Sequence, residues 1–278
     1  MENITRTVYG SALQSAMFAG IPFSMDNNTT LNEKFGVLAG QPPEEGKMPT
    51  AQYYCIGNGG HQLATGTGGV ALVETVQHTA TDAALYKHLP FALRLATSDL
   101  GPAQQAQYAL RTPVTISGQS YFAYYLKRLV TNGAEVNSTL QSVVNGITTS
   151  SNFIPTTANL SPTPPVLNSA GANVLASQYV NCSTTLPINL TQSECAEIMD
   201  AATLLYGDPA YAIISEIGIC TGVDKLITLP NGQAFNEAVG VQISSFINTM
   251  HVVQYTATGI SGSFDFGSSD PLLVLAPL

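Results

Sequence analysis

The chain has 278 residues and a formal net charge of −9, from 9 Lys and Arg against 18 Asp and Glu. Charged residues make up 10% of the chain and apolar residues 45%, whereas an average soluble chain has about 25% charged residues. The shortage of basic residues argues against nucleic-acid binding, and no apolar run is long enough for a transmembrane helix. The apolar content is sufficient for a core, so the surface must draw its polarity mainly from Ser, Thr, Asn and Gln.

The start of the sequence and its cysteines indicate the compartment. Residues 1–6 lack the basic start and apolar run of a signal peptide, so synthesis in the cytoplasm is expected. None of the four cysteines forms a C-x-x-C pair, which argues against a zinc or redox motif. Cys182 and Cys195 are near enough in sequence to bridge, although free thiols are the expected state in a cytoplasmic chain.

The first expected element is a helix over residues 9–20, which ends at Gly20 with Pro22 beyond it. Residues 40–50 contain three prolines and are expected to form a loop. Six glycines between Gly57 and Gly69 indicate another loop or a bulged hairpin. After these segments the pattern becomes β-like, with strands expected over residues 70–76, 108–117 and 121–130.

Four Asn-Gly pairs favour a meandering antiparallel sheet over a parallel one. The pair Asn132-Gly133 follows an expected strand and is typical of a type I′ hairpin, whose return strand would begin at Glu135 and Val136. The other three pairs begin at Asn58, Asn145 and Asn231.

The middle of the chain has an unusual composition. Residues 136–193 contain no Asp, Glu, Lys, Arg or His, and the centre of this stretch is rich in proline. Two interpretations stand at this point. The segment is either a long extended arm that lies against another surface, or an uncharged surface loop.

A second helix begins after this stretch. Thr191 and Glu194 have the spacing of a capping box, and Ile198, Ala202 and Leu205 fall on one helical face that ends at Gly207. The remaining expected strands cover residues 211–220, a hairpin over 226–235, and residues 238–247, 250–258 and 271–276.

These elements predict an α+β fold, predominantly antiparallel β in a meander or sandwich-like arrangement, with a few short helices and a long extended uncharged arm. Three parts are expected: an N-terminal α+β part over residues 1–135, the arm or loop over 136–193, and a C-terminal part over 194–278 with a helix and antiparallel strands. Alternatively, the first and last parts form a single domain.

Catalytic motifs are missing from the sequence. It has no G-x-S-x-G elbow, no phosphate-binding loop and no H-E-x-x-H pair, so no catalytic, cofactor-binding or metal site is predicted. Five aspartates adjoin turn-forming sequence and are expected to make turn or cap hydrogen bonds: Asp99, Asp208, Asp224, Asp265 and Asp270. The enzymatic alternative is a site assembled from dispersed residues such as His61, His78 or His88.

Residues 207–219 read GDPAYAIISEIGI, and this segment resembles a strand phrase, I-[ST]-E-[IV]-G-L, of tail and baseplate proteins of tailed bacteriophages. Ile219 stands where the phrase has Leu. The resemblance implies a multi-copy structural subunit of a virion, without enzymatic activity and without cofactors.

Composition agrees with this implication, because neutral polar side chains are buried in an interface at a lower cost than unpaired charges. The sequence therefore predicts a non-enzymatic baseplate or tail component. Its partners would be other virion proteins and copies of itself, with no nucleic acid and no membrane. A neck, collar or capsid-associated protein is the alternative within the virion. A carbohydrate-binding receptor-recognition module is the alternative from another class.

Overall fold

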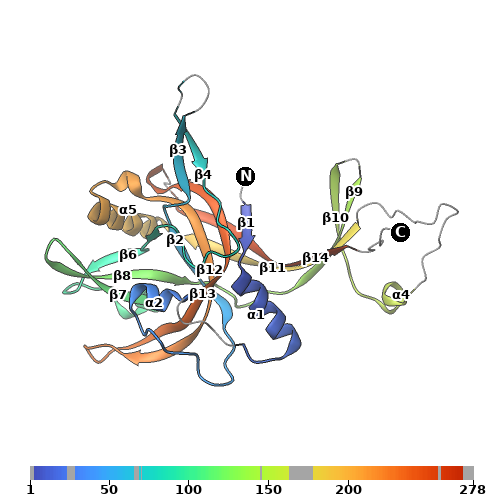
Figure 1. Ribbon diagram of the computed structural model, residues 1–278, viewed down its shortest axis with the longest axis horizontal. Coiled ribbons are helices and arrows are strands. Elements are labelled where there is room, and N and C mark those ends of the chain that lie inside the picture. Colours follow the sequence, from blue (N-terminus) through green and yellow to red (C-terminus); the bar gives the residue numbers. More distant parts are fainter. Residues whose placement is uncertain are drawn as a thin grey trace. The chain divides into compact units, whose positions relative to one another are not determined.

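A computed structural model describes residues 3–23, 29–65, 69, 71–144, 146–162, 178–255 and 258–271 of the chain (Figure 1). The chain forms two compact units. The first unit consists of residues Met1–Val130 and Asn189–Ser261, and the second of Thr131–Ile188 and Gly262–Leu278. Antiparallel sheets predominate and the helices are short, which confirms the predicted α+β class.

The first unit is built on an eight-stranded sheet with a hairpin beside it. Six strands follow one another across the sheet: β1 (Asn3–Arg6), β13 (Ala234–Val252), β12 (Ile213–Thr228), β2 (Thr50–Gly57), β8 (Gln119–Arg128) and β6 (Ala92–Leu95). Two more strands attach to this path, β5 (His88–Leu89) at β2 and β7 (Tyr108–Ile116) at β8. A separate hairpin extends beyond the sheet (Figure 1) and consists of β3 (His61–Thr65) and β4 (Ala71–Thr75).

Three helices of the first unit pack on this sheet, and a fourth follows β6. The helices α1 (Val8–Ala19) and α2 (Leu31–Phe35) contact β13, and α5 (Gln192–Tyr206) contacts β6. The fourth is the short α3 (Pro102–Gln105). Single 3-10 turns cover Pro209–Tyr211 and Val253–Tyr255.

Local capping interactions account for the two longest helices and confirm both predictions. At α1, the Thr7 side chain accepts from Gly10 N, and the left-handed Gly20 ends the helix. At α5, the Thr191 hydroxyl accepts from Glu194 N, and the Glu194 carboxylate accepts from Thr191 N at 2.8 Å. Gly207 ends α5 in the left-handed conformation, as the sequence predicted.

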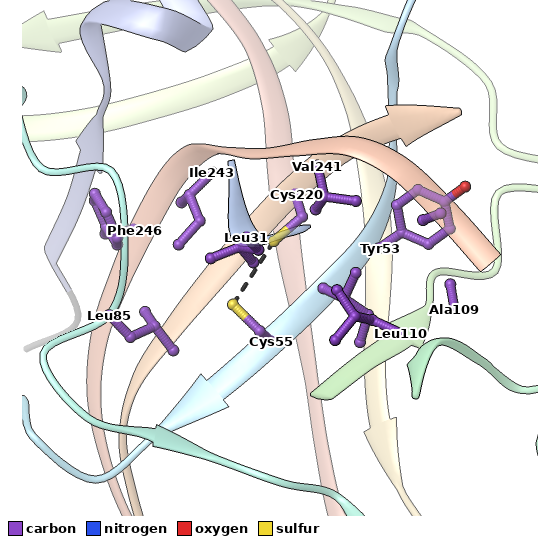
Figure 2. Packing of buried hydrophobic residues seen from close by; sticks show 12 residues of the cluster. Leu31, Tyr53, Cys55, Leu85, Ala109, Leu110, Cys220, Val241, Ile243 and Phe246 are labelled. Atoms are coloured by element: carbon purple, nitrogen blue, oxygen red, sulfur yellow. Dashed lines mark hydrogen bonds between the residues drawn. The ribbon is translucent and has the colours of Figure 1, made fainter. Parts of the chain in front are cut away.

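The core of the first unit lies between the central strands and α2, which contributes Leu31 to the buried cluster (Figure 2). Cys55 of β2 and Cys220 of β12 meet there, and their sulfur atoms are 3.6 Å apart. All side chains drawn in Figure 2 are buried, which provides a large apolar contribution to folding. The labelled members are Leu31, Tyr53, Cys55, Leu85, Ala109, Leu110, Cys220, Val241, Ile243 and Phe246.

The second unit is a four-stranded sheet with strand order β10 (Ile147–Asn152), β9 (Asn137–Val144), β11 (Gln178–Leu190) and β14 (Ile260–Pro271). One short helix, α4 (Thr157–Leu160), follows β10. The predicted arm or loop over residues 136–193 therefore contains three of these strands and α4, and it includes residues 163–177, which lie outside the described residues.

Two strand predictions were wrong. The turn at Gly133 exists, but the chain does not return along β8, because β7 covers one side of that strand and β2 and β6 cover the other. The strands predicted over residues 238–247 and 250–258 are largely one strand, β13, which continues through buried Asn248 and ends at Val252. Beyond Pro271, the strand predicted over 271–276 lies outside the described residues.

Candidate functional site

A fully buried carboxylate with four hydrogen-bond donors, that of Glu216 in β12, is the centre of the main polar cluster in the first unit. This side chain is fully buried. Its Oε1 atom accepts hydrogen bonds from Gly59 N at 2.9 Å and Lys87 N at 3.0 Å. Its Oε2 atom accepts from Tyr86 N at 3.0 Å and His78 Nε2 at 2.7 Å. Four donors therefore satisfy the ionised carboxylate.

The His78 ring is held from its edges and from both faces. Its Nδ1 atom lies 2.9 Å from Asp82 Oδ2, so both ring nitrogens face carboxylate oxygens. The rings of Tyr86 and Phe246 stack on its two faces, with centroids 4.1 and 3.8 Å away. Burial raises the pKa of Asp82, but hydrogen bonds from Thr79 and His78 outweigh it, and the pKa is lower than usual.

Glycines allow the backbone to approach Glu216 closely. A Cβ atom at Gly57 would lie 2.5 Å from Glu216 Oε1, and one at Gly59 would lie 2.8 Å from Lys87 N. At Gly60 it would lie 2.6 Å from the Ser215 carbonyl oxygen. The glycine cluster that sequence analysis interpreted as a loop or hairpin therefore encloses a buried carboxylate.

The contacts of the Glu216–His78 cluster favour a role in holding the fold together over a role in proton transfer. A general base needs a free acceptor within reach of a substrate. The Glu216 oxygens are all engaged, and the His78 ring is covered on both faces. Its contacts join β12 to the ends of three segments that are distant in sequence.

The structure brings two of the three candidate histidines to consecutive residues of β12. His61 Nδ1 lies 3.0 Å from Ser215 Oγ, next to the Glu216 contact of His78. His88 is not part of this cluster's hydrogen bonds. It is half-buried with its ring against Phe35, its Nε2 atom accepts from Leu85 N at 3.2 Å, and desolvation of the ring lowers its pKa to about 3.

The predicted turn and cap roles of the aspartates hold at two positions and were wrong at three. Asp208 caps the turn at Ala210, and Asp99 accepts from the next backbone amide, at Leu100. The other three lie within strands, and the partners of two of them, Asp224 and Asp265, are far away in sequence. Asp224 pairs with Arg128 and Tyr53, Asp265 accepts from Thr185 Oγ1 at 2.6 Å, and Asp270 lies near Ser268 in β14.

A second buried carboxyl group lies at β7. Glu237 of β13 accepts a hydrogen bond from Arg111 N at 3.0 Å, and burial raises its pKa to about 8. The Arg111 side chain itself pairs with Asp99. The carboxyl group of Glu237 therefore keeps its proton to a higher pH than an exposed glutamate does.

Comparison with known proteins identifies the family. The model of a family of unknown function, DUF7208, matches residues 1–277. The chain belongs to DUF7208. No curated protein and no solved structure matches the DUF7208 chain.

The described part of the DUF7208 chain holds neither a metal-binding cluster nor a membrane-spanning helix. Within it, no group of three or more His, Cys, Asp or Glu side chains is arranged to hold a metal ion. No helix in the described ranges is long and apolar enough to cross a membrane.

The four cysteines of the DUF7208 chain are free thiols. Burial raises the pKa of Cys220 well above its usual value and also raises the pKa of Cys195. Cys182 is half-buried and lies 3.3 Å from Ser138 Oγ. The disulfide between Cys182 and Cys195 that sequence spacing left open is not formed.

The DUF7208 chain leaves apolar side chains uncovered at α1. Phe18 is 96% exposed, and Val8, Met17 and Ile21 are also exposed. Beside the end of α1 lies a groove of about 850 Å³, formed with the proline-rich loop predicted over residues 40–50. Its lining consists of Ala16, Met17, Gly20, Ile21, Pro22, Phe23 and residues 42–49.

Proposed function

We propose that this protein is a non-enzymatic structural subunit of a tailed-phage virion, a baseplate or tail component that acts through protein–protein interfaces. Its partners are other virion proteins and further copies of itself, and its location is the assembled particle.

The observation that carries this proposal is the chemistry of the second unit. The charged side chains of residues 131–188 and 262–278 are three carboxylates, Glu135, Asp265 and Asp270, and there is no basic residue. Among its described residues, the buried hydrophobic side chains are Leu186, Ile188 and Phe264.

A small sheet with few buried side chains gains little stability from its own core. Additional burial against a neighbouring subunit would supply what the second unit lacks. Its hydroxyl and amide side chains suit that burial, because a hydrogen-bonded neutral group is desolvated at far lower cost than an unpaired ion. Exposed Val136, Ile147, Ile154 and Leu160 add apolar area for such contacts.

The assignment to a phage particle relies on the strand phrase over residues 207–219. In this chain residues 213–219 of the phrase belong to β12, an inner strand of the first unit's sheet. Ser215 Oγ accepts from Gly60 N at 3.0 Å, and Glu216 anchors the buried cluster. At Gly218, a Cβ atom would lie 2.8 Å from Cys55 Sγ. The residues of the phrase thus have structural roles within the first unit.

The test is incorporation into particles. Particles are purified by density gradient from cells that carry the gene in its native phage or prophage, and a parallel culture carries a deletion of the gene. We expect the chain in the particle fraction at a fixed ratio to other virion proteins, and incomplete or non-infectious particles from the deletion. A 29.2 kDa chain that remains in the supernatant, with intact infectious particles from the deletion, would overturn the proposal.

A further inference from the structure

The strand β10 forms one edge of the second unit's sheet, and every one of its residues is exposed. Its sequence, ITTSSN, contains no charged residue and no proline. Among the described residues its only strand neighbour is β9. One row of backbone N–H and C=O groups therefore faces solvent along β10, and such a row is a template for pairing with another strand.

The other long edges of the described sheets have protection that β10 lacks. Besides β10, two described strands of more than five residues have a neighbour on one side only, β7 and β14. β7 contains Arg111 and Pro113. β14 contains Asp265 and Asp270 and ends at Pro271. Charges and prolines at an edge oppose pairing with further strands, so β10 stands out among these edges.

The register of the β9–β10 hairpin determines which residues of β10 point their backbone groups outward. Val144 and Ile147 face each other across a two-residue turn. Residues that flank such a turn form a hydrogen-bonded pair, and this role alternates along an antiparallel ladder. The residues whose backbone groups face the free edge are therefore Thr148, Ser150 and Asn152.

These three residues allow β10 to pair with itself. In an antiparallel pair related by a two-fold axis, Ser150 would face its own copy, Thr148 would face Asn152, and Thr149 would face Ser151. Every facing pair then joins hydroxyl or amide side chains, and such cross-strand pairs can form hydrogen bonds. No like charges would face each other despite the chain's net charge of −9.

We propose that β10 is a homotypic interface, through which two copies of this chain join their four-stranded sheets edge to edge about a two-fold axis at Ser150. The partner that pairs with this edge is a second copy of the chain. In the register that places Ser150 opposite Ser150, the outward-facing residues Thr148, Ser150 and Asn152 of one copy all lie opposite those of the other. This inference rests on the proposed role as an assembly subunit and names one of its contacts.

The test uses charge at the proposed axis. Ser150→Lys and Ser150→Asp each place two like charges opposite one another in the pair, and Ser150 is exposed, so neither change should impair folding. We expect the wild-type chain to be a dimer by size-exclusion chromatography with light scattering. Each variant alone should be monomeric, and an equimolar mixture of the two should recover the dimer.

Thr157→Lys serves as the matched control, because it adds the same charge at an exposed residue of the same unit outside β10. It should leave the dimer unchanged. Amide hydrogen exchange gives a second measurement: the amides of Thr148, Ser150 and Asn152 should be protected in the wild-type dimer and not in the Ser150→Lys variant.

The outcomes separate this inference from the proposed function. A wild-type monomer, or a dimer that survives Ser150→Lys, overturns the β10 interface even if the chain is found in particles. A dimer that dissociates in both single variants and returns in their mixture supports the β10 interface. This holds even if the chain is absent from particles, a result that would overturn the virion role alone.

Discussion

His78 Nε2 lies 2.7 Å from Glu216 Oε2, and both side chains are fully shielded from solvent. An ionised carboxylate at such a position is stable only when donors surround it, and three backbone amides complete the set. The pair is therefore part of the folding of the first unit, because it fixes the segments around residues 59, 78 and 86 against β12.

The first prediction concerns Glu216→Gln. The substituted amide has one oxygen and one donor group where the carboxylate has two oxygens, so its NH₂ group would face N–H donors. We expect the free energy of unfolding to fall by about 3–5 kcal/mol, the range for loss of one partner of a buried ion pair. Urea denaturation measures this loss. Glu45→Gln, at an exposed loop position, should change stability by less than about 0.5 kcal/mol. Equal stabilities of the two variants would contradict the structural role.

The second prediction concerns the glycines around this carboxylate. In Gly60→Ala the new Cβ atom would meet the Ser215 carbonyl oxygen at 2.6 Å, and a backbone oxygen in a sheet cannot move aside alone. We expect a loss of about 1–3 kcal/mol in unfolding free energy, as for overpacked cores. Gly101→Ala is the control, because its Cβ atom would meet nothing nearer than 3.9 Å. The melting temperature of the control should remain close to that of the wild type, and a similar drop in both would refute the argument.

Sequence reasoning succeeded where structure is determined locally. The C-terminal ends of both long helices and the capping box of α5 were predicted because these signals lie within a few residues of the helix: Gly20 for α1, and Thr191, Glu194 and Gly207 for α5. The Thr7 cap at the start of α1 was not predicted. The antiparallel class was predicted for the same reason, since it follows from alternating residues and tight turns.

Sequence reasoning failed where residues far away in the sequence determine a side chain's environment or a strand's pairing. Glu216 looks like an ordinary strand residue, because its contact with His78 joins residues 138 positions apart in the sequence. The closely spaced glycines at 57, 59 and 60 were the one local sign in the sequence that the backbone approaches a buried side chain there. Likewise, β8 gives no local sign that both of its sides are occupied, so the Asn132-Gly133 turn led to a wrong return strand.

The third prediction is a pH dependence due to Glu237. Burial raises the pKa of its carboxyl group from 4.5 to about 8 in the folded chain, so the folded state retains a proton that the unfolded state has lost. Stability is therefore fully present below about pH 4.5 and falls as the pH rises toward 8. The loss has an upper limit of roughly 5 kcal/mol.

Glu237→Gln isolates this effect, because the amide oxygen can still accept from Arg111 N but cannot ionise. The variant should match the wild type at pH 5 and exceed its unfolding free energy at pH 9, with urea denaturation at both values. His88 titrates with the opposite sign: burial lowers its pKa to about 3, so its contribution is lost as the pH falls below about 6.5. Both proteins share His88, and its effect cancels in their difference. A difference that does not grow with pH would contradict the raised pKa of Glu237.

The fourth prediction concerns the order of thiol reactivity. Cys55, Cys195 and Cys220 are buried and Cys182 is half-buried, so the native chain should react with a thiol reagent first at Cys182. Mass spectrometry should find one modified cysteine under native conditions and four in denaturant. Cys182→Ser should abolish the fast reaction and leave the unfolding free energy nearly unchanged.

Rapid native modification of Cys55 or Cys220 would show that β2 and β12 separate readily at the centre of the core. That result would conflict with the Glu216 cluster, because the hydrogen bond from Gly59 N, two residues beyond β2, and the β2–β12 ladder both hold the end of β2 against β12. Slow modification at these two cysteines should instead follow global unfolding, and Glu216→Gln should accelerate it in proportion to its loss of stability.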